Sequence, residues 1–335
     1  MERNILVDKL KGYACFLVLF GHVIMGIRFA GVSVPFFFEG MEKFIWSFHV
    51  ALFMFLSGVV YKETGEWKGK KTKSNFILHK LLNLGVPYIA FSALYILINS
   101  FVGQANSQAS LTDILFIWKT PIAQYWFLYA LFFLFLIWTL CSGVLKNWQT
   151  TLIVFAVACL ATIFNIPLGS FSIVIYSGLA FGLGTVLDFK SLTKPARWVK
   201  IFIIVSHIVT GIVTVAFDLI ELPFVEDIML LFGIYSSIML ISLLQNIKPV
   251  HRFLLFTNKY SLQIYLLHTI FTAGIRIVLV NLGVFQWWIH VVLGTTCGIV
   301  FSVLAAVIAK KTKVLDFFFF PVKTYNYLKS SKEKA

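Results

Sequence analysis

The chain has 335 residues, of which 59% are hydrophobic and only 13% are charged, and its mean hydropathy is +0.89. This composition is far more apolar than that of soluble globular proteins and excludes a water-soluble fold. The formal net charge is +14, but the basic residues are dispersed between apolar runs and not gathered on one soluble face, which argues against nucleic-acid binding. The four cysteines stand singly, without metal-ligand spacing, so we expect no metal site.

Apolar runs recur along the whole chain. Because a spanning helix needs roughly 20 apolar residues, we predict an all-α polytopic membrane protein with a bundle of about ten transmembrane helices. The domain is predicted to cover 1–310, followed by a basic and aromatic cytoplasmic tail at 311–335 that lies on the inner membrane surface. In chain order, the predicted helices are 8–27, 44–61, 81–102, 124–145, 150–165, 172–188, 199–217, 228–246, 259–281 and 286–309.

The basic residues fall on alternate sides of these helices very unequally. With the N-terminus in the cytoplasm, 24 of the 28 Lys and Arg residues lie on the inner side. The outer side receives only Arg28, Lys43 and Lys119, and Arg276 falls inside a helix. By the positive-inside rule, both termini are predicted to be cytoplasmic, which requires an even number of spans.

Few ionisable residues fall inside the predicted spans, and each is a functional candidate because burial in hydrocarbon is costly. His22 follows Lys11 by eleven residues, which returns the two side chains to within about 20° of one helix face. Lys11, Cys15, Val18 and His22 thus form a stripe from the inner edge into the membrane. A neutral imidazole is well suited to take a proton from a hydroxyl near neutral pH, although a hydrogen bond between helices is the alternative role.

His49 comes early in the second helix, which runs inward, so it is expected at a depth similar to that of His22. On the ninth helix, Ser261, Tyr265 and His268 form a polar stripe for which we predict a structural use. The lysines between residues 62 and 80 are predicted to set the topology, and the alternative is attraction of an anionic cosubstrate.

Four motifs in order resemble acyltransferase family 3, the membrane-bound acyltransferases. They are DKLKGYACFLVLFGH at 8–22, SFHVALFMFLSG at 47–58, YWFLYALF at 125–132 and NKYSLQIYLLH at 258–268. The resemblance covers residue 8 to about 268. It implies a ten-helix membrane domain that transfers acyl groups, usually acetyl from a cytosolic thioester, to hydroxyls of sugars on surface glycans or other exported compounds.

Carried over by position, the resemblance implies that His22 is the catalytic histidine and Lys11 the basic member of its pair. It places His49, Ser57 and Gly58 in the second motif, so we take His49 as a third catalytic candidate. Lys11, Lys73 and Lys80 are the candidates for binding acetyl-CoA as cosubstrate, with no metal.

One stretch departs from the family pattern. Many members have two basic residues three apart before the proline that opens the third helix, whereas this chain reads HKLLNLGVP, with Lys80 at the first place and Asn83 at the second. Donor contacts carried over to this stretch are therefore in doubt. Larger members append an extracytoplasmic hydrolase-like domain; here we expect the stand-alone form.

The function predicted from the sequence is transfer of acetyl from acetyl-CoA to a sugar hydroxyl of a surface glycan, exopolysaccharide or lipid-linked precursor in a bacterial inner membrane. The expected partners are membrane lipid, the glycan acceptor, acyl-CoA and a glycan-assembly machinery, but not nucleic acid. A transporter or flippase for a glycan is the main alternative. It predicts inverted repeats with broken helices, and no repeat is visible. A membrane scaffold or sensor would leave the histidines unexplained.

Overall fold

The computed structural model describes residues 4–65, 68, 72–101, 110–219 and 222–332. These residues form helices and contain no β-strand, as predicted for an all-α protein. The longer helices are α1 (Ile5–Phe29), α3 (His49–Glu63), α5 (Val86–Phe101), α6 (Trp126–Cys141), α7 (Asn147–Ile163), α8 (Phe171–Val186), α10 (Arg197–Ala216), α11 (Pro223–Leu244), α13 (Ser261–Asn281) and α14 (Trp287–Ala309). The shorter elements are α2 (Phe36–Trp46), α4 (Lys73–Lys80), the π-helix η2 (Leu81–Gly85), the 3₁₀ helices η3 (Leu111–Phe116) and η4 (Ala123–Tyr125), α9 (Phe189–Leu192), α12 (Lys248–Lys259), α15 (Lys313–Phe319) and α16 (Pro321–Lys332).

Each of the ten predicted spans overlaps one of the longer helices. Within the described residues, eight helical segments are long and apolar enough to cross a membrane. Two shorter apolar helices, α7 and α8, occupy the places of the other two predicted spans. The all-α membrane bundle is thus confirmed, while the total of about ten spans and the cytoplasmic termini remain predictions.

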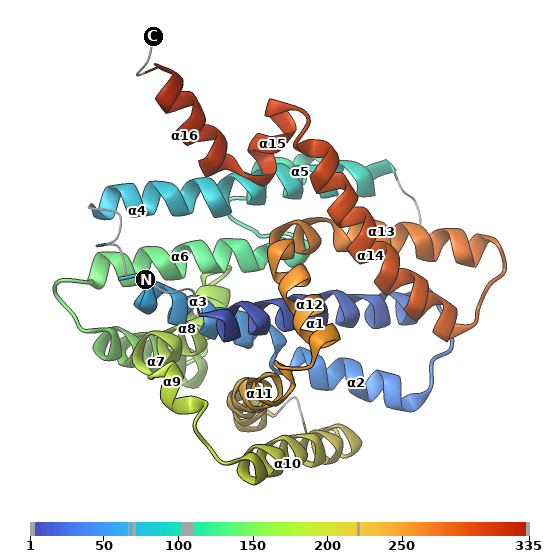
Figure 1. Ribbon diagram of the computed structural model, residues 1–335, viewed down its shortest axis with the longest axis horizontal. Helices are drawn as coiled ribbons and strands as arrows, with labels where there is room; N and C mark the ends of the chain where they lie inside the picture. Colours follow the sequence, from blue (N-terminus) through green and yellow to red (C-terminus); the bar gives the residue numbers. More distant parts are fainter. Residues whose placement is uncertain (1–3, 66–67, 69–71, 102–109, 220–221, 333–335) are drawn as a thin grey trace.

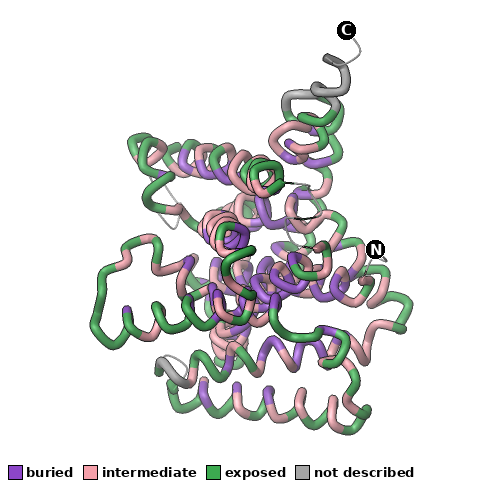
Figure 2. Tube along the Cα trace, turned by 90° about the vertical axis from the view of Figure 1, so that its left-hand side faces the viewer, coloured by how far each residue is buried: buried purple, intermediate pink, exposed green. Residues whose placement is uncertain are grey.

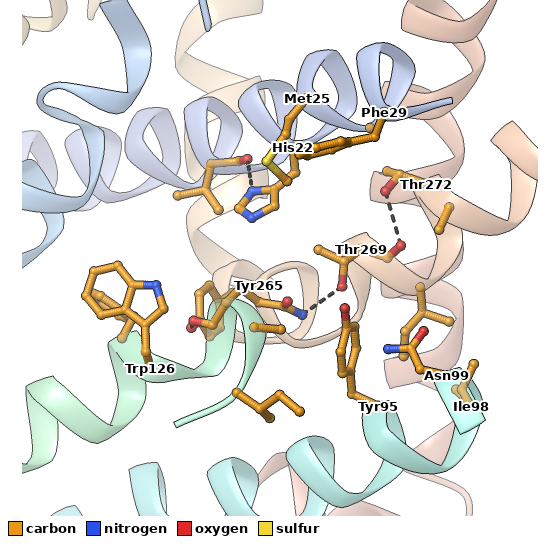
Figure 3. Close-up of a pocket in the computed structure, with 18 of the residues that line it drawn as sticks. His22, Met25, Phe29, Tyr95, Ile98, Asn99, Trp126, Tyr265, Thr269 and Thr272 are labelled. Carbon is orange, nitrogen blue, oxygen red and sulfur yellow. Dashed lines mark hydrogen bonds between the residues drawn. The ribbon is translucent and has the colours of Figure 1, made fainter. Parts of the chain in front are cut away.

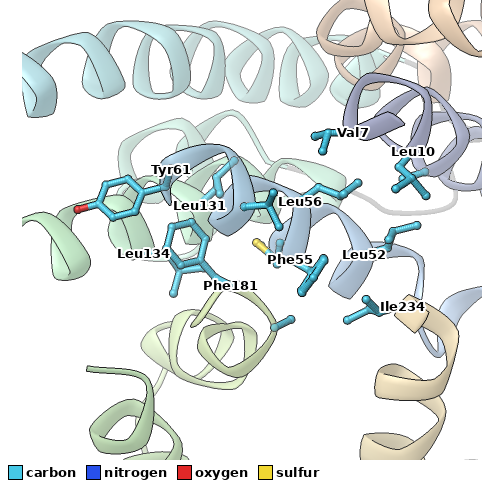
Figure 4. Close-up of a cluster of buried hydrophobic side chains, with 14 of the residues drawn as sticks. Val7, Leu10, Leu52, Phe55, Leu56, Tyr61, Leu131, Leu134, Phe181 and Ile234 are labelled. Carbon is cyan, nitrogen blue, oxygen red and sulfur yellow. The ribbon is translucent and has the colours of Figure 1, made fainter. Parts of the chain in front are cut away.

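Helix α1 runs through the middle of the bundle (Figure 1) and contacts α2, α3, α11, α12, α13 and α14. The largest buried cluster lies beside it, where α3 packs against α1, α6, α8 and α11 (Figure 4). Its members include Leu10, Leu52, Phe55, Leu134 and Phe181, all close to fully buried. This packing fixes the position of α3 against the central helix.

Two glycines allow an unusually close crossing of α3 and α8. A methyl group on Gly58 would overlap the carbonyl oxygen of Phe181, and one on Gly184 would overlap the carbonyl oxygen of Phe55. Small residues let membrane helices approach to backbone contact. The glycine that ends the second motif is therefore a packing residue.

Two predicted helices contain breaks that apolar periodicity did not indicate. The second span is split at Ser47 and Phe48, where Phe48 leaves the helical region with φ −141° and ψ −19°. The third span has its π-helical turn directly before Pro87. A proline has no N–H to donate to the residue four positions earlier and its ring clashes with that carbonyl, so the wider turn at Leu81–Gly85 accommodates it.

The outer faces of the bundle are apolar. Figure 2 shows buried segments concentrated in its interior and exposed segments around them. On α10, for example, Trp198, Phe202 and Ile212 are exposed, as expected of a helix that faces lipid. The predicted tail begins on the bundle itself, because Phe319 of α15 is buried and its ring lies 5.0 Å from that of Phe91 on α5. Whether the tail also lies on the inner membrane surface remains a prediction.

Candidate active site

A cavity of about 690 Å³ opens between α1, α3, α5, α6 and α13. Both histidines singled out in the first two motifs, His22 and His49, line it. Aromatic side chains make up much of the wall, together with the polar residues Asn99, Gln124 and Thr269 (Figure 3). The cavity reaches the protein surface at Phe29, which is 67% exposed.

The cavity lies in the half of the bundle remote from most of the basic residues. It is lined by the second half of α1, the start of α3, the end of α5, the start of α6 and the part of α13 from Tyr265 to Ile277. The opposite ends of these helices carry or adjoin the lysines of the chain, among them Lys11, Lys62 and Lys259. The opening of the cavity at Phe29, its rim, therefore lies on the side of the bundle with few basic residues.

His22 is held in one orientation by its own helix. Its Nδ1 lies 2.8 Å from the carbonyl oxygen of Val18, and a carbonyl can only accept, so Nδ1 carries the proton. In the neutral ring, Nε2 is then the proton acceptor. Figure 3 shows the ring pointing into the cavity. The arrangement presents a basic nitrogen to any molecule bound there.

His49 begins α3 directly after the helix break and is only 1% exposed. Its Nδ1 lies 2.8 Å from the carbonyl oxygen of Ile45, so it has the same tautomer as His22. Trp46 lies between the two histidines, with its ring centroid 5.2 Å from that of His22 and 5.3 Å from that of His49. The break therefore places a second imidazole and an indole on one wall of the cavity.

His268, which the sequence indicated only as part of a structural stripe, lies against His22. The two ring centroids are 4.9 Å apart in an edge-to-face arrangement. Nδ1 of His268 lies 2.9 Å from the carbonyl oxygens of Ile264 and Tyr265, and its buried Nε2 has no hydrogen-bond partner. In the sequence, only its place in the polar stripe and in the fourth motif indicated His268. Its contact with His22 could not be predicted, because it joins helices that are far apart in the chain.

The third and fourth motifs bind each other. The Tyr125 hydroxyl donates to the carbonyl oxygen of Leu266 at 2.8 Å, and the Tyr265 hydroxyl donates to the carbonyl oxygen of Gln124. The Gln124 amide in turn donates to Thr269 Oγ1 at 2.7 Å. These bonds fix η4 against α13, and with it the floor of the cavity.

The three predicted lysines lie outside the cavity lining. Lys73 Nζ donates to the carbonyl oxygens of Leu140 and Ser142 at the end of α6, and Lys80 Nζ lies 3.5 Å from the ring centroid of Phe135. Positive charge at a helix carboxyl end is stabilising. Lys62, like Lys73, lies at the carboxyl end of a helix, because its Nζ donates to two carbonyl oxygens at the end of α8.

Only part of the stripe predicted on α1 faces the cavity. Val18 and His22 line the cavity, but Cys15 is 3% exposed and its Sγ lies 3.7 Å from the carbonyl oxygen of Ser261. Lys11 lies one turn further toward the basic end. The inner part of the stripe is thus packed against the start of α13.

A family model described as an acyltransferase domain matches residues 4–308. The chain belongs to acyltransferase family 3. Comparisons with curated proteins and with solved structures gave no match. The acyltransferase therefore combines a membrane bundle with a histidine-lined cavity. Among its described residues, no group of three or more His, Cys, Asp or Glu side chains is arranged to hold a metal ion.

Proposed function

We propose that this acyltransferase transfers acetyl from acetyl-CoA to a sugar hydroxyl of a surface glycan, exopolysaccharide or lipid-linked precursor, with His22 as general base. The observation that carries the proposal is the bond from Nδ1 of His22 to Val18, which leaves Nε2 as a proton acceptor facing a cavity of about 690 Å³. Volumes of 300–1,000 Å³ are typical of small-molecule sites.

The chemistry of the transfer needs one base and a defined orientation. Nε2 of His22 takes the proton of the acceptor hydroxyl as the hydroxyl oxygen attacks the thioester carbonyl. When the carbon–sulfur bond breaks, the imidazolium returns this proton to the sulfur, which leaves as the CoA thiol. An imidazole with its other nitrogen already bound keeps its orientation during this step. His49 and Trp46 border the same space and orient the reacting groups.

The acceptor enters from the outer side of a bacterial inner membrane in this proposal. The charge distribution predicts that the lysine-rich helix ends are cytoplasmic, and the cavity is lined by the opposite halves of the helices. A glycan unit outside the membrane, or one carried on a lipid by a glycan-assembly machinery, thus reaches His22 without crossing the bundle.

The donor approaches from the lysine-rich end, with Lys11, Lys73 and Lys80 as candidate contacts for the CoA phosphates. Because Cys15 is packed against Ser261, the thioester can follow the stripe on α1 to His22 only when α1 moves relative to α13. Lys73 must also exchange its carbonyl partners at the end of α6 for phosphate oxygens. Donor binding and helix movement are therefore coupled.

The proposal is tested by comparing surface glycans from cells that carry the wild-type protein, the His22→Gln variant or no copy of the gene. Mass spectrometry should show one acetyl increment on modified sugars in the wild type only. Purified protein in nanodiscs should release CoA from acetyl-CoA in the presence of acceptor. Glycan movement across vesicles without any CoA release would instead support the transporter alternative.

A further inference from the structure

Arg276 is an ionisable residue of the cavity that the proposed mechanism does not use. It lies in α13 and lines the main cavity, and with His22 and Thr272 it also borders a small adjoining space. An arginine within a membrane span is a functional candidate because placing its charge there is costly. Among the described residues that line the main cavity it is the one cation, and Asp113 is the one anion.

The neighbouring helix leaves room for the guanidinium. A methyl group on Gly26 of α1 would overlap Arg276 Nη1, and Gly26 itself lines the cavity. Arg276 stands two turns after His268, which contacts His22. The backbone positions of His268 and Arg276 are therefore about 12 Å apart along the axis of α13. The cavity therefore has a basic nitrogen at one position and a guanidinium nearer the rim.

A buried amide donor lies at the same end of the cavity. Asn99 lines the wall from α5, and its Nδ2 is buried without a hydrogen-bond partner. Asn99 is one turn after Tyr95, and both residues line the same cavity as Arg276. Buried donors normally have a partner, so an unpaired amide on a residue that lines a cavity points to a ligand oxygen.

We propose that Arg276 and Asn99 bind a carboxylate of the acceptor, so that the preferred acceptor is an acidic sugar of the uronic acid class. A guanidinium and an amide N–H together match the two oxygens of a carboxylate. This inference rests on the proposed function, since it assumes that the acceptor occupies this cavity. The carboxylate near the rim then sets which hydroxyl of the sugar reaches His22.

The test measures binding without any donor. Purified full-length protein in nanodiscs is titrated with sodium glucuronate and with the neutral methyl glucoside, and bound ligand is detected by saturation-transfer NMR. Glucuronate should bind more tightly than methyl glucoside, and its affinity should fall with rising salt. Arg276→Gln should weaken glucuronate binding at least about ten-fold, in line with the loss of a charge-assisted bond, without changing binding of the neutral sugar.

Two further variants keep the test decisive. Asn99→Asp has nearly the same shape but replaces the donor with a second carboxylate, so it should also reduce glucuronate binding even if Arg276→Gln fails to fold. Arg28→Gln is the matched control, because Arg28 is exposed at the end of α1, pairs with Glu42 at 2.9 Å and is not among the cavity-lining residues. It should bind glucuronate like the wild type.

Equal binding of the two sugars, or wild-type glucuronate binding in both cavity variants, would overturn the inference. So would tighter binding of monomethyl succinate than of glucuronate, since the carboxylate would then belong to a dicarboxylic acyl group. Acetylation of a neutral glycan with no glucuronate preference leaves the proposed function intact and refutes this site. Glucuronate binding that depends on Arg276, without any acyl transfer, supports the site and refutes the proposed function.

Discussion

Replacing His22 with glutamine separates its proposed chemistry from its structural contact. The side-chain amide of glutamine can donate a hydrogen bond to Val18, as Nδ1 of His22 does at 2.8 Å, but it cannot take up a proton near neutral pH. Loss or weakening of that single bond costs about 1 kcal/mol of folding stability. Loss of a general base typically lowers the rate 10²- to 10⁴-fold, about 3–5 kcal/mol of barrier. We therefore expect a folded protein with almost no transfer activity.

The assay is acceptor-dependent release of CoA by protein purified in detergent or nanodiscs, with size-exclusion profiles and thermal melting recorded on the same samples. His207→Gln is the matched control, because His207 is also buried in a membrane helix and its Nδ1 lies 2.7 Å from the Ser236 hydroxyl, but it is not among the cavity-lining residues. It should lose some stability and keep its activity. Near-normal transfer by His22→Gln at matched expression would remove His22 from the mechanism and leave His49 as the candidate base.

Three further predictions concern the neighbouring histidine, the helix crossing and the topology. If His268 positions His22, His268→Gln should lower the transfer rate and alter the pH profile of transfer. An unchanged pH profile together with reduced stability would show that His268 is only a packing residue. Gly184→Leu should lower the melting temperature, because the new side chain overlaps the backbone of α3 and overpacking costs about 1–3 kcal/mol or more. The control Gly274→Ala places its methyl group in open space and should be neutral or stabilising. Equal melting temperatures of the two variants would contradict the close crossing of α3 and α8. In a background without native cysteines, Thr120→Cys lies on the predicted outer side and should react with an impermeant thiol reagent in intact cells. Ala196→Cys lies on the predicted inner side and should not react. The reverse pattern would overturn the cytoplasmic placement of the termini.

The sequence was sufficient to predict the helices because hydrophobicity along the chain is a local property. Each apolar run that is long enough must be a helix in a bilayer, where every backbone polar group needs a partner within the segment. The break at Ser47 and Phe48 was not predicted, because both flanking segments are apolar and the hydropathy pattern continues across it. The π-helical turn had a readable signal in Pro87, whose position inside an apolar run requires a local distortion.

The sequence indicated only some of the residues that the structure brings together in the candidate site. Spacing on one helix indicated His22, and similar depth indicated His49, but the contact between His22 and His268 depends on how α1 packs against α13. The sequence indicates Arg276 clearly as a lone charge inside a predicted span, although the charge count treats it only as an exception. Lys73 stays a predicted phosphate contact, and its carbonyl partners at the end of α6 could not be predicted because they lie almost seventy positions away in the chain.

The position of the cavity constrains the order of events in transfer. The walls near His22 are continuous with the rim at Phe29, whereas the path toward Lys11 is interrupted where Cys15 meets Ser261. In the proposed mechanism, the described conformation is therefore open to an acceptor at the outer rim and closed to a thioester along the stripe on α1. If both paths were open together, the membrane would have a continuous channel through this bundle. In the proposed mechanism, movement of α1 that admits the donor is therefore accompanied by occupation or closure of the outer part, and an acceptor bound near the rim provides that occupation.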